Sequence, residues 1–263
     1  MGVDLAGYIK ERHARQVRQL HAQKVFPKLA IVQVKDDPVI NTYVRLKQQY
    51  GADIGVSVDV YTPKQAEAPQ ILNKLSNDDS VHGIIVQLPL SNPTQTDKIV
   101  NLVAPRKDVD ALGKDSKFEP ATPMAILWLL SGFNVDLTGK QVLIIGRGKL
   151  VGEPLAEILN KSSISVKTVD RQVKDLAAYT RDADVIITAT GSPAILYPDM
   201  IKHGAVVVDA GVASEEGKTV GDLDASVYNR DDLTLTPQKG GVGPLTVCAL
   251  FENVIRAAQN AAG

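Results

Sequence analysis

The feature of this sequence that most limits its possible folds is a regular alternation of short apolar runs with longer segments of helical periodicity. Three apolar runs in the first part are predicted strands, at 28–34, 56–61 and 82–88. The segments of helical periodicity beside them lie at 41–54, 68–75 and 96–103. Strands that alternate with helices predict a parallel sheet with right-handed crossovers and helices on both faces.

A second series of the same kind begins after a polar, proline-containing break at 104–123. Its predicted strands lie at 141–145, 164–169, 184–189, 205–209 and 233–236. Its predicted helices lie at 124–133, from the glycines at 146–152 to 159, and near 174–181. A last helix, 245–258, follows a hinge-like stretch of glycines and is expected to return to the first domain. We therefore predict a two-domain α/β protein, with residues 1–117 completed by 245–263 and a Rossmann-like domain over 118–244.

Composition excludes several classes of protein. The 29 basic and 30 acidic residues leave no excess positive charge for nucleic acid, and the apolar runs are too short to span a membrane. Cys248 is the only cysteine, which rules out an intrachain disulfide and fits a reducing compartment. The four histidines are scattered away from other metal ligands, so we predict no protein-bound metal. Charged residues from Lys10 onward interrupt the N-terminus, which favours a cytoplasmic protein.

A glycine-rich loop predicts a dinucleotide site. Gly146, Arg147 and Gly148 follow a predicted strand, and Gly152 opens the next helix. Glycines permit a tight turn and a close approach of the backbone to a pyrophosphate, which the helix N-terminus stabilises. The third glycine comes one place later than in the usual G-x-G-x-x-G fingerprint. The interpretation therefore depends on the predicted strand before the loop and the predicted helix after it.

The end of the next strand is where such sites distinguish NAD from NADP. Asp170 would hold a free 2′-hydroxyl, whereas Arg171, with Arg147 as a second cation, would pair with a 2′-phosphate. We favour NADP over NAD. Loops after two later strands, containing Thr190, Gly191 and Val212, are expected to line the ribose and nicotinamide.

Candidate catalytic residues lie in the first part of the chain. Tyr43 and Lys47 share one face of a predicted helix, and a buried lysine with a lowered pKa suits general acid–base chemistry. Gln87 is an amide within an apolar strand, where it is either a hydrogen-bonded core residue or a group that reaches a site at the strand end. Of Asp108 and Asp110, one is expected to cap a helix or bind substrate.

Together these motifs resemble the bifunctional methylenetetrahydrofolate dehydrogenase/cyclohydrolase (FolD) family. The matching blocks occur in the family's order from Tyr43 to Thr246, nearly the whole chain: Tyr43-x-x-x-Lys47, Val86-Gln87-Leu88-Pro89-Leu90, Lys107-Asp108-Val109-Asp110, Pro120-Ala121-Thr122-Pro123, Gly146-Arg147-Gly148 with Val151-Gly152-x-Pro154, and Gly240-Gly241-Val242-Gly243-Pro244-Leu245-Thr246.

The resemblance implies a folate-binding catalytic domain, an NADP domain, a cytoplasmic homodimer and a role in one-carbon metabolism that includes purine biosynthesis. It implies that methylenetetrahydrofolate binds between the domains, is oxidised to methenyltetrahydrofolate, and is hydrolysed to formyltetrahydrofolate. Lys47 would then be the acid–base residue of hydrolysis, Tyr43 would stack on the folate, Gln87 would tune Lys47, and Asp110 would bind the pterin. The folate site would be walled by Gly241, Val242, Gly243 and Pro244.

The chain departs from the family pattern in places. Ala111 replaces a glycine, and the stretch after it is shortened to 112–118; further departures are Ala121, Gly148, Gln238 and Lys239. The shortened stretch leaves open a dehydrogenase with weak cyclohydrolase activity, although Tyr43, Lys47 and Gln87 are intact. Another two-domain NADP dehydrogenase and a redox-sensing Rossmann module are more distant alternatives. The latter would be expected to bring a DNA-binding segment or a basic face.

The NADP interpretation predicts that Arg171→Ala weakens binding of NADP far more than that of NAD, because only NADP carries the 2′-phosphate that the guanidinium would pair with. Titration calorimetry with both nucleotides measures the two losses. Equal losses would contradict the assignment of Arg171 to the 2′-phosphate.

Overall fold

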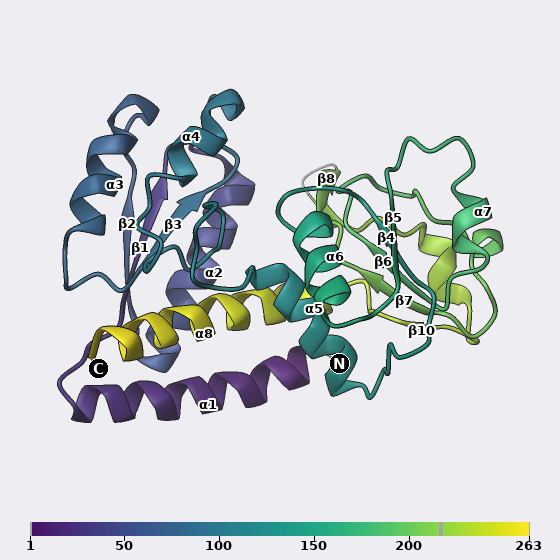
Figure 1. The fold of residues 1–263 in the computed structure, drawn as a ribbon, viewed down its shortest axis with the longest axis horizontal. Helices are drawn as coiled ribbons and strands as arrows, with labels where there is room; N and C mark the ends of the chain where they lie inside the picture. Colours follow the sequence, from purple (N-terminus) through teal and green to yellow (C-terminus); the bar gives the residue numbers. More distant parts are fainter. Residues whose placement is uncertain (1, 216–217, 263) are drawn as a thin grey trace. The chain divides into compact units, whose positions relative to one another are not determined.

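The computed structural model describes residues 2–215 and 218–262 and confirms the predicted two-domain α/β class (Figure 1). The chain divides into two compact units. The first-sheet unit comprises Gly7–Ala121 and Val247–Gly263. The second-sheet unit comprises Met1–Ala6 and Thr122–Thr246. The C-terminal helix α8 (Val242–Ala262) therefore supplies most of its length to the first-sheet unit, as predicted.

The first sheet has three parallel strands in the order β2-β1-β3, with β1 at Lys28–Gln33, β2 at Ser57–Tyr61 and β3 at Gly83–Gln87. Alternate side chains point to opposite faces of a strand. On one face, Ala30 and Val32 of β1 join Ile84 and Val86 of β3 in a buried cluster. Helices α3 (Ala68–Ser76) and α4 (Thr96–Val100) supply the rest of that cluster, with apolar residues of the loops beside them.

Helix α2 (Pro38–Ile54) is fixed at both ends by its own sequence. The Asp37 side chain accepts hydrogen bonds from the backbone amides of Val39 (3.0 Å) and Ile40 (3.4 Å), and Pro38 occupies the first helical turn. At the other end, Gly55 has a φ of 85°, the left-handed conformation that commonly ends a helix. Val44, Tyr50 and Ile54 are buried, so the intervening polar side chains lie on the other faces of the helix.

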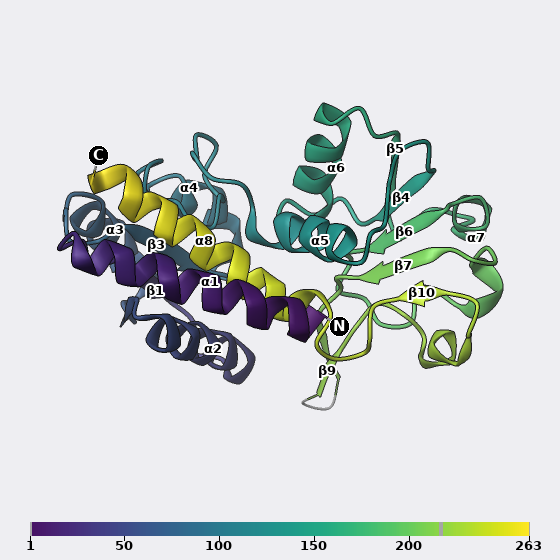
Figure 2. The same ribbon diagram turned by 90° about the horizontal axis from the view of Figure 1, so that it is seen from below.

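Helix α1 (Gly2–Ala22) was not predicted from the sequence. Its buried stripe consists of Ile9, His13, Val17 and Leu20, which recur at helical spacing. His13 is fully buried. Its two ring nitrogens have hydrogen-bond partners there, the Tyr50 hydroxyl (2.9 Å) and a Glu252 carboxylate oxygen of α8 (2.8 Å). Within the first-sheet unit, α1 and α8 run side by side (Figure 2). A histidine within the stripe and many charges beside it conceal the helical pattern.

The second sheet has five parallel strands in the order β10-β7-β6-β4-β5. Their bounds are Val142–Ile145 (β4), Val166–Val169 (β5), Val185–Thr188 (β6), Val206–Asp209 (β7) and Thr234–Leu235 (β10). Its helices are α5 (Ala121–Gly132), α6 (Gly152–Lys161) and α7 (Ala177–Thr180). The chain passes from β4 to β5 on one side and returns to β6 on the other. Such a reversal creates a crevice at the carboxyl ends of β4 and β6, where open α/β sheets bind their ligands.

Several boundaries differ from the prediction. Helix α4 ends at Val100 and not at 103, and α8 begins at Val242, within the stretch predicted to be a hinge. Only Gly240 in that stretch has a positive φ, 77°. An antiparallel hairpin, β8 (Ala213–Glu215) and β9 (Lys218–Val220), was not predicted. Short 3-10 turns lie at Gln65–Glu67, Pro93–Gln95, Pro198–Met200 and Ala225–Asn229.

The end of α2 gives a test of the fold. Gly55→Ala should lower the free energy of unfolding by about 1 kcal/mol, because a left-handed backbone places a β-carbon against the following carbonyl. Gly7→Ala is the matched control: Gly7 is exposed in α1 with open space around it, so alanine should raise stability by about 0.5–1 kcal/mol. Urea denaturation measures both, and equal effects of the two substitutions would contradict this description of the α2 terminus.

Candidate active site

Lys47 forms the centre of the candidate site in the first-sheet unit. It lies one turn after Tyr43 on α2, as the sequence predicted, while Arg45 and Gln48 are exposed. Its ammonium nitrogen, Nζ, donates to Oε1 of Gln87 at 2.7 Å. Gln87 is the last residue of β3, and its side-chain amide nitrogen, Nε2, donates to the Leu88 carbonyl oxygen at 3.2 Å. The predicted amide within an apolar strand is therefore a hydrogen-bonded group at the strand end.

Burial lowers the pKa of Lys47 from the ordinary value of 10.5, because removal from water disfavours the charged form. The negative charge of Asp110 acts in the opposite direction and partly offsets this effect. Burial likewise raises the pKa of Asp110, against the stabilising charge of Lys47. The pKa of the Tyr43 phenol is also raised by burial. The site therefore favours a lysine that can lose its proton closer to neutral pH than an exposed lysine does.

Asp108 has a structural role. It is buried, and its carboxylate accepts hydrogen bonds from the backbone amides of Gly113 (2.8 Å) and Leu112 (3.3 Å). Burial raises the pKa of Asp108 to about 6, in spite of these bonds. Ala111 lies in the turn that Asp108 closes and has a φ of 55°, which is the conformation that favours glycine. Of the two acids, Asp108 thus caps a turn, where a helix cap was predicted, and Asp110 lies in the electrostatic environment of Lys47.

The segment that carries these acids is held from two sides. The buried Lys107 donates from Nζ to the carbonyl oxygens of Leu75 (3.1 Å) and Asp78 (2.7 Å), near the end of α3. The side-chain amide of Asn253, on α8, donates to the carbonyls of Val109 and Glu119, both at 2.9 Å. These contacts fix the backbone on either side of Asp110, although the stretch 112–118 is short.

In the second-sheet unit, the glycine-rich loop leaves β4 at the predicted place. Gly146 has a φ of 119°, and a β-carbon there would lie 2.4 Å from the Ala189 carbonyl oxygen. A β-carbon on Gly152 would lie 2.0 Å from the Gly146 carbonyl oxygen. Both positions therefore require glycine, which folds the loop tightly between β4 and α6. A β-carbon on Gly148 would meet nothing within 4 Å, so the middle of the loop is open to a ligand.

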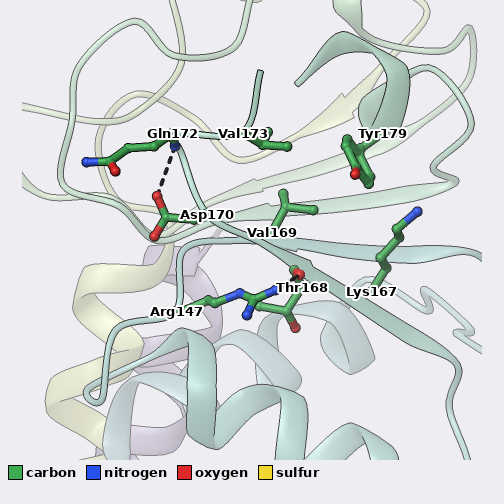
Figure 3. A pocket seen from close by; sticks show the side chains of 8 residues that line it. All are labelled: Arg147, Lys167, Thr168, Val169, Asp170, Gln172, Val173 and Tyr179. Atoms are coloured by element: carbon green, nitrogen blue, oxygen red, sulfur yellow. Dashed lines mark hydrogen bonds between the residues drawn. The ribbon is translucent and has the colours of Figure 1, made fainter. Parts of the chain in front are cut away.

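A pocket of about 430 Å³ lies beside this loop along β5 (Figure 3). Its lining residues are Arg147, Lys167, Thr168, Val169, Asp170, Gln172, Val173 and Tyr179. Arg147 donates to the Thr168 carbonyl oxygen at 2.9 Å, and the Lys167 ammonium lies 4.2 Å from the centre of the Tyr179 ring. The pocket thus presents two cations and one aromatic ring. The sequence did not indicate a role for Lys167, because a charged residue on a short strand is typical of a side chain that faces solvent.

The structure places Arg171 differently from Arg147. Arg171 is not among the residues that line this pocket, and its guanidinium donates to the Ser192 hydroxyl. Asp170, the residue that would favour NAD, accepts a hydrogen bond from the backbone amide of Gln172 at 2.9 Å. Arg171 is therefore joined to the loop after β6, which contains Thr190 and Gly191.

The loops after β6 and β7 approach each other closely. Gly191 has a φ of 63°, and a β-carbon there would lie 3.2 Å from the Val212 carbonyl oxygen. The Val212 side chain is exposed. Gly241 precedes α8, while Val242, Gly243 and Pro244 form its first turn; Val242 is buried and Gly243 is exposed. The four residues predicted to wall the folate site therefore lie at one helix start.

Among residues 2–215 and 218–262, no group of histidine, cysteine and acidic side chains is arranged to hold a metal ion. None of the helices described is long and apolar enough to cross a membrane.

Comparison with known proteins identifies the family. Residues 1–110 match the family model of the tetrahydrofolate dehydrogenase/cyclohydrolase catalytic domain, and residues 120–262 match that of its NAD(P)-binding domain. The "Bifunctional protein FolD" of Campylobacter jejuni strain RM1221 is 38% identical over 98% of this chain and 97% of its own. The protein of the same name from Staphylococcus aureus strain Newman is 37% identical over 92% of this chain and 90% of its own.

Solved structures of the same family are similar to this chain over nearly its whole length. The crystal structure of the Campylobacter jejuni bifunctional FolD enzyme superposes with a TM-score of 0.93 at 37% identity, covering 98% of this chain and 97% of that one. The Trypanosoma brucei FolD enzyme, solved with NADP and an inhibitor, gives a TM-score of 0.92 at 28% identity, covering 98% and 96%. The chain belongs to the tetrahydrofolate dehydrogenase/cyclohydrolase family, which confirms the resemblance that its motifs predicted.

Proposed function

We propose that this chain is a bifunctional enzyme of folate one-carbon metabolism. It oxidises 5,10-methylenetetrahydrofolate to 5,10-methenyltetrahydrofolate with NADP, and it hydrolyses the methenyl compound to 10-formyltetrahydrofolate. The observation that carries this proposal is the desolvated Lys47, hydrogen-bonded to Gln87 at 2.7 Å, in a chain that belongs to this family over nearly its whole length. The relatives named bifunctional are similar over both units.

The second-sheet unit suits a dinucleotide. The tight turn at Gly146, the open space at Gly148 and the start of α6 form a cradle of backbone amides for a pyrophosphate. Bound NADP accepts the hydride from the one-carbon unit of the folate. The residues proposed to hold it are Gly146, Arg147, Gly148, Arg171, Thr190, Gly191 and Val212. We add Lys167 to this proposal because it lines the same pocket as Arg147.

The cations favour NADP over NAD. Arg147 and Lys167 line one pocket, and a 2′-phosphate is a better partner for two cations than a neutral ribose hydroxyl is. Asp170 lies in the same lining and its negative charge would repel a phosphate, but it is one anion beside two cations. The positive charge is therefore the stronger influence on the choice of nucleotide.

Hydrolysis requires one group that first accepts and then donates a proton. Neutral Lys47 takes a proton from water as the water oxygen bonds to the electrophilic methenyl carbon. Lys47 then returns a proton to the folate nitrogen that leaves that carbon, so the ring opens to the formyl compound. The two transfers leave Lys47 neutral. The second proton of the attacking water is released to solvent, which balances the positive charge of the methenyl substrate. A lowered lysine pKa serves both transfers, because the base is available and its conjugate acid is a good donor.

The remaining residues have proposed supporting roles. Gln87 orients and tunes Lys47 through the hydrogen bond described above. Asp110 accepts hydrogen bonds from the pterin and sets the charge near Lys47. Tyr43 stacks on the folate, and residues 241–244 form a wall of its site.

Three further properties are predictions from family membership: that the enzyme is a homodimer, that it acts in the cytoplasm, and that its formyl product supports purine biosynthesis. The dehydrogenase-only alternative depends on the short stretch 112–118. The capping of its turn by Asp108 and the bonds from Asn253 nearby support an ordered Asp110 and favour both activities.

Lys47→Met tests the proposal. Absorbance follows methenyl formation from methylenetetrahydrofolate with NADP and, separately, the decay of added methenyl compound. The wild-type enzyme should perform both steps, and Lys47→Met should slow ring opening by about a hundredfold or more, because water then lacks a proton acceptor. NADP binding should change by less than about threefold, since Lys47 and the nucleotide loops lie in different units.

Lys98→Met is the matched control, because Lys98 is an exposed lysine of the same unit. It should leave both steps unchanged. Normal ring opening in Lys47→Met would contradict the assignment of Lys47, and methenyl formation without enzyme-dependent decay in the wild type would establish the dehydrogenase-only alternative.

A further inference from the structure

Two acids of the second-sheet unit, the half-buried Asp209 and the buried Asp222, have no part in the proposed chemistry. Asp209 ends β7, and Asp222 follows the hairpin β8–β9 and has no exposed surface. Their carboxylates lie against glycine backbone: a β-carbon on Gly211 would be 2.0 Å from Oδ1 of Asp222, and one on Gly221 would be 2.0 Å from Oδ2 of Asp209. Such close approach at two places shows that the local backbone is built around these side chains.

Asp209 fixes the backbone of Asp222 to the sheet. Its carboxylate accepts hydrogen bonds from the Thr188 hydroxyl (3.0 Å), at the end of β6, and from the backbone amide of Gly211 (2.9 Å). It also accepts from the backbone amides of Asp222 (3.0 Å to Oδ2) and Leu223 (3.2 Å). The Asp222 backbone is thereby tied to the carboxyl edge of β6 and β7.

Asp222 in turn binds the loop after β6. Its Oδ2 accepts from the backbone amide (2.7 Å) and the hydroxyl (2.9 Å) of Thr190, and its Oδ1 accepts from the backbone amide of Ser192 (2.9 Å). The Ser192 hydroxyl accepts from Arg171. A continuous path of hydrogen bonds therefore runs from β7 through Asp209 and Asp222 to the loop 190–192 and to the Arg171 side chain.

We propose that Asp222 is a positioning residue for the nucleotide: it holds the loop 190–192, and through Ser192 the Arg171 side chain, in the conformation that binds NADP. This inference rests on the proposed function, in which that loop and Arg171 contact the nucleotide. Burial and the charge of Asp209 raise the pKa of Asp222, and the hydrogen bonds from Thr190 and Ser192 act in the opposite direction and stabilise the carboxylate form. A buried acceptor with three donors from one loop gives that loop a single conformation.

Asp222→Asn tests this role with little change of shape. An amide has one acceptor oxygen and one donor nitrogen, whereas both carboxylate oxygens of Asp222 face backbone amides. At least one of those amides therefore loses its acceptor in either orientation of the asparagine. Titration calorimetry should show NADP binding weakened by about tenfold or more. The KM for NADP should rise in parallel, while kcat at saturating NADP and the KM for the folate change by less than about threefold.

Asp224→Asn is the matched control. Asp224 lies two residues away, and one of its oxygens accepts from the Ser226 backbone amide at 2.9 Å. The variant therefore removes a carboxylate charge outside the loop path, while the asparagine oxygen can keep the bond to Ser226. It should bind NADP like the wild type. Gly211→Ala forces a β-carbon into the space of the Asp222 carboxylate, and should weaken NADP binding to a similar extent. Combined with Asp222→Asn, it should add little further loss, because both changes break the same contact.

Ring opening of added methenyl compound without nucleotide separates positioning from folding, because it depends on Lys47 in the other unit. It should be unchanged in Asp222→Asn. NADP binding within about twofold of wild type in Asp222→Asn would overturn the proposal, and so would a joint loss of NADP binding and ring opening, which marks a folding defect. A wild-type protein that fails to bind NADP would instead refute the proposed function itself.

Discussion

The hydrogen bond between Lys47 and Gln87 joins a helix to the end of a strand, and the proposed chemistry depends on it. The bond requires the carboxyl end of β3 to face α2 at one particular turn. Asp37 and Gly55 set the two ends of that helix, and the buried Val44, Tyr50 and Ile54 set its rotation against the unit's core. Desolvation then shifts the lysine towards its neutral form, while Asp110 limits the shift. The fold of the first-sheet unit thus places and tunes one amine.

The second-sheet unit also has a parallel sheet, but its sheet positions loops for a nucleotide. Parallel strands bring their carboxyl ends to one edge, so loops distant in the sequence meet there. Glycines at 146, 152 and 211 let these loops approach to distances that any side chain would prevent. The carboxylates of the half-buried Asp209 and the buried Asp222 then accept hydrogen bonds from the backbone amides of these loops. The close backbone contacts at these glycines and the carboxylates that bind the loop amides together give the loops a defined conformation for binding a nucleotide.

The sequence predicted the strands of both sheets because they leave short apolar runs, which are continuous in the fully buried strands β4 and β6. It predicted Lys47, Gln87 and the glycine loop from their places in the predicted helices and strands together with the resemblance of their motifs to the family. It did not predict α1, whose buried stripe includes a histidine, nor the separate surroundings of Arg147 and Arg171. The pairing of Asp222 with the loop 190–192 joins residues about thirty positions apart, which no local pattern reveals. Roles that depend on such distant contacts required the structure.

A direct measurement of the Lys47 pKa tests the central claim. Proteins with carbon-13 in the lysine ε position can be titrated by NMR, with the Lys47 signal assigned by its loss in Lys47→Met. We expect Lys47 to titrate below the ordinary lysine value of 10.5. In Gln87→Glu the titration should move to higher pH, because a carboxylate stabilises the ammonium form. A wild-type Lys47 that titrates at or above the ordinary lysine value of 10.5 would contradict the account of this residue as a desolvated proton acceptor.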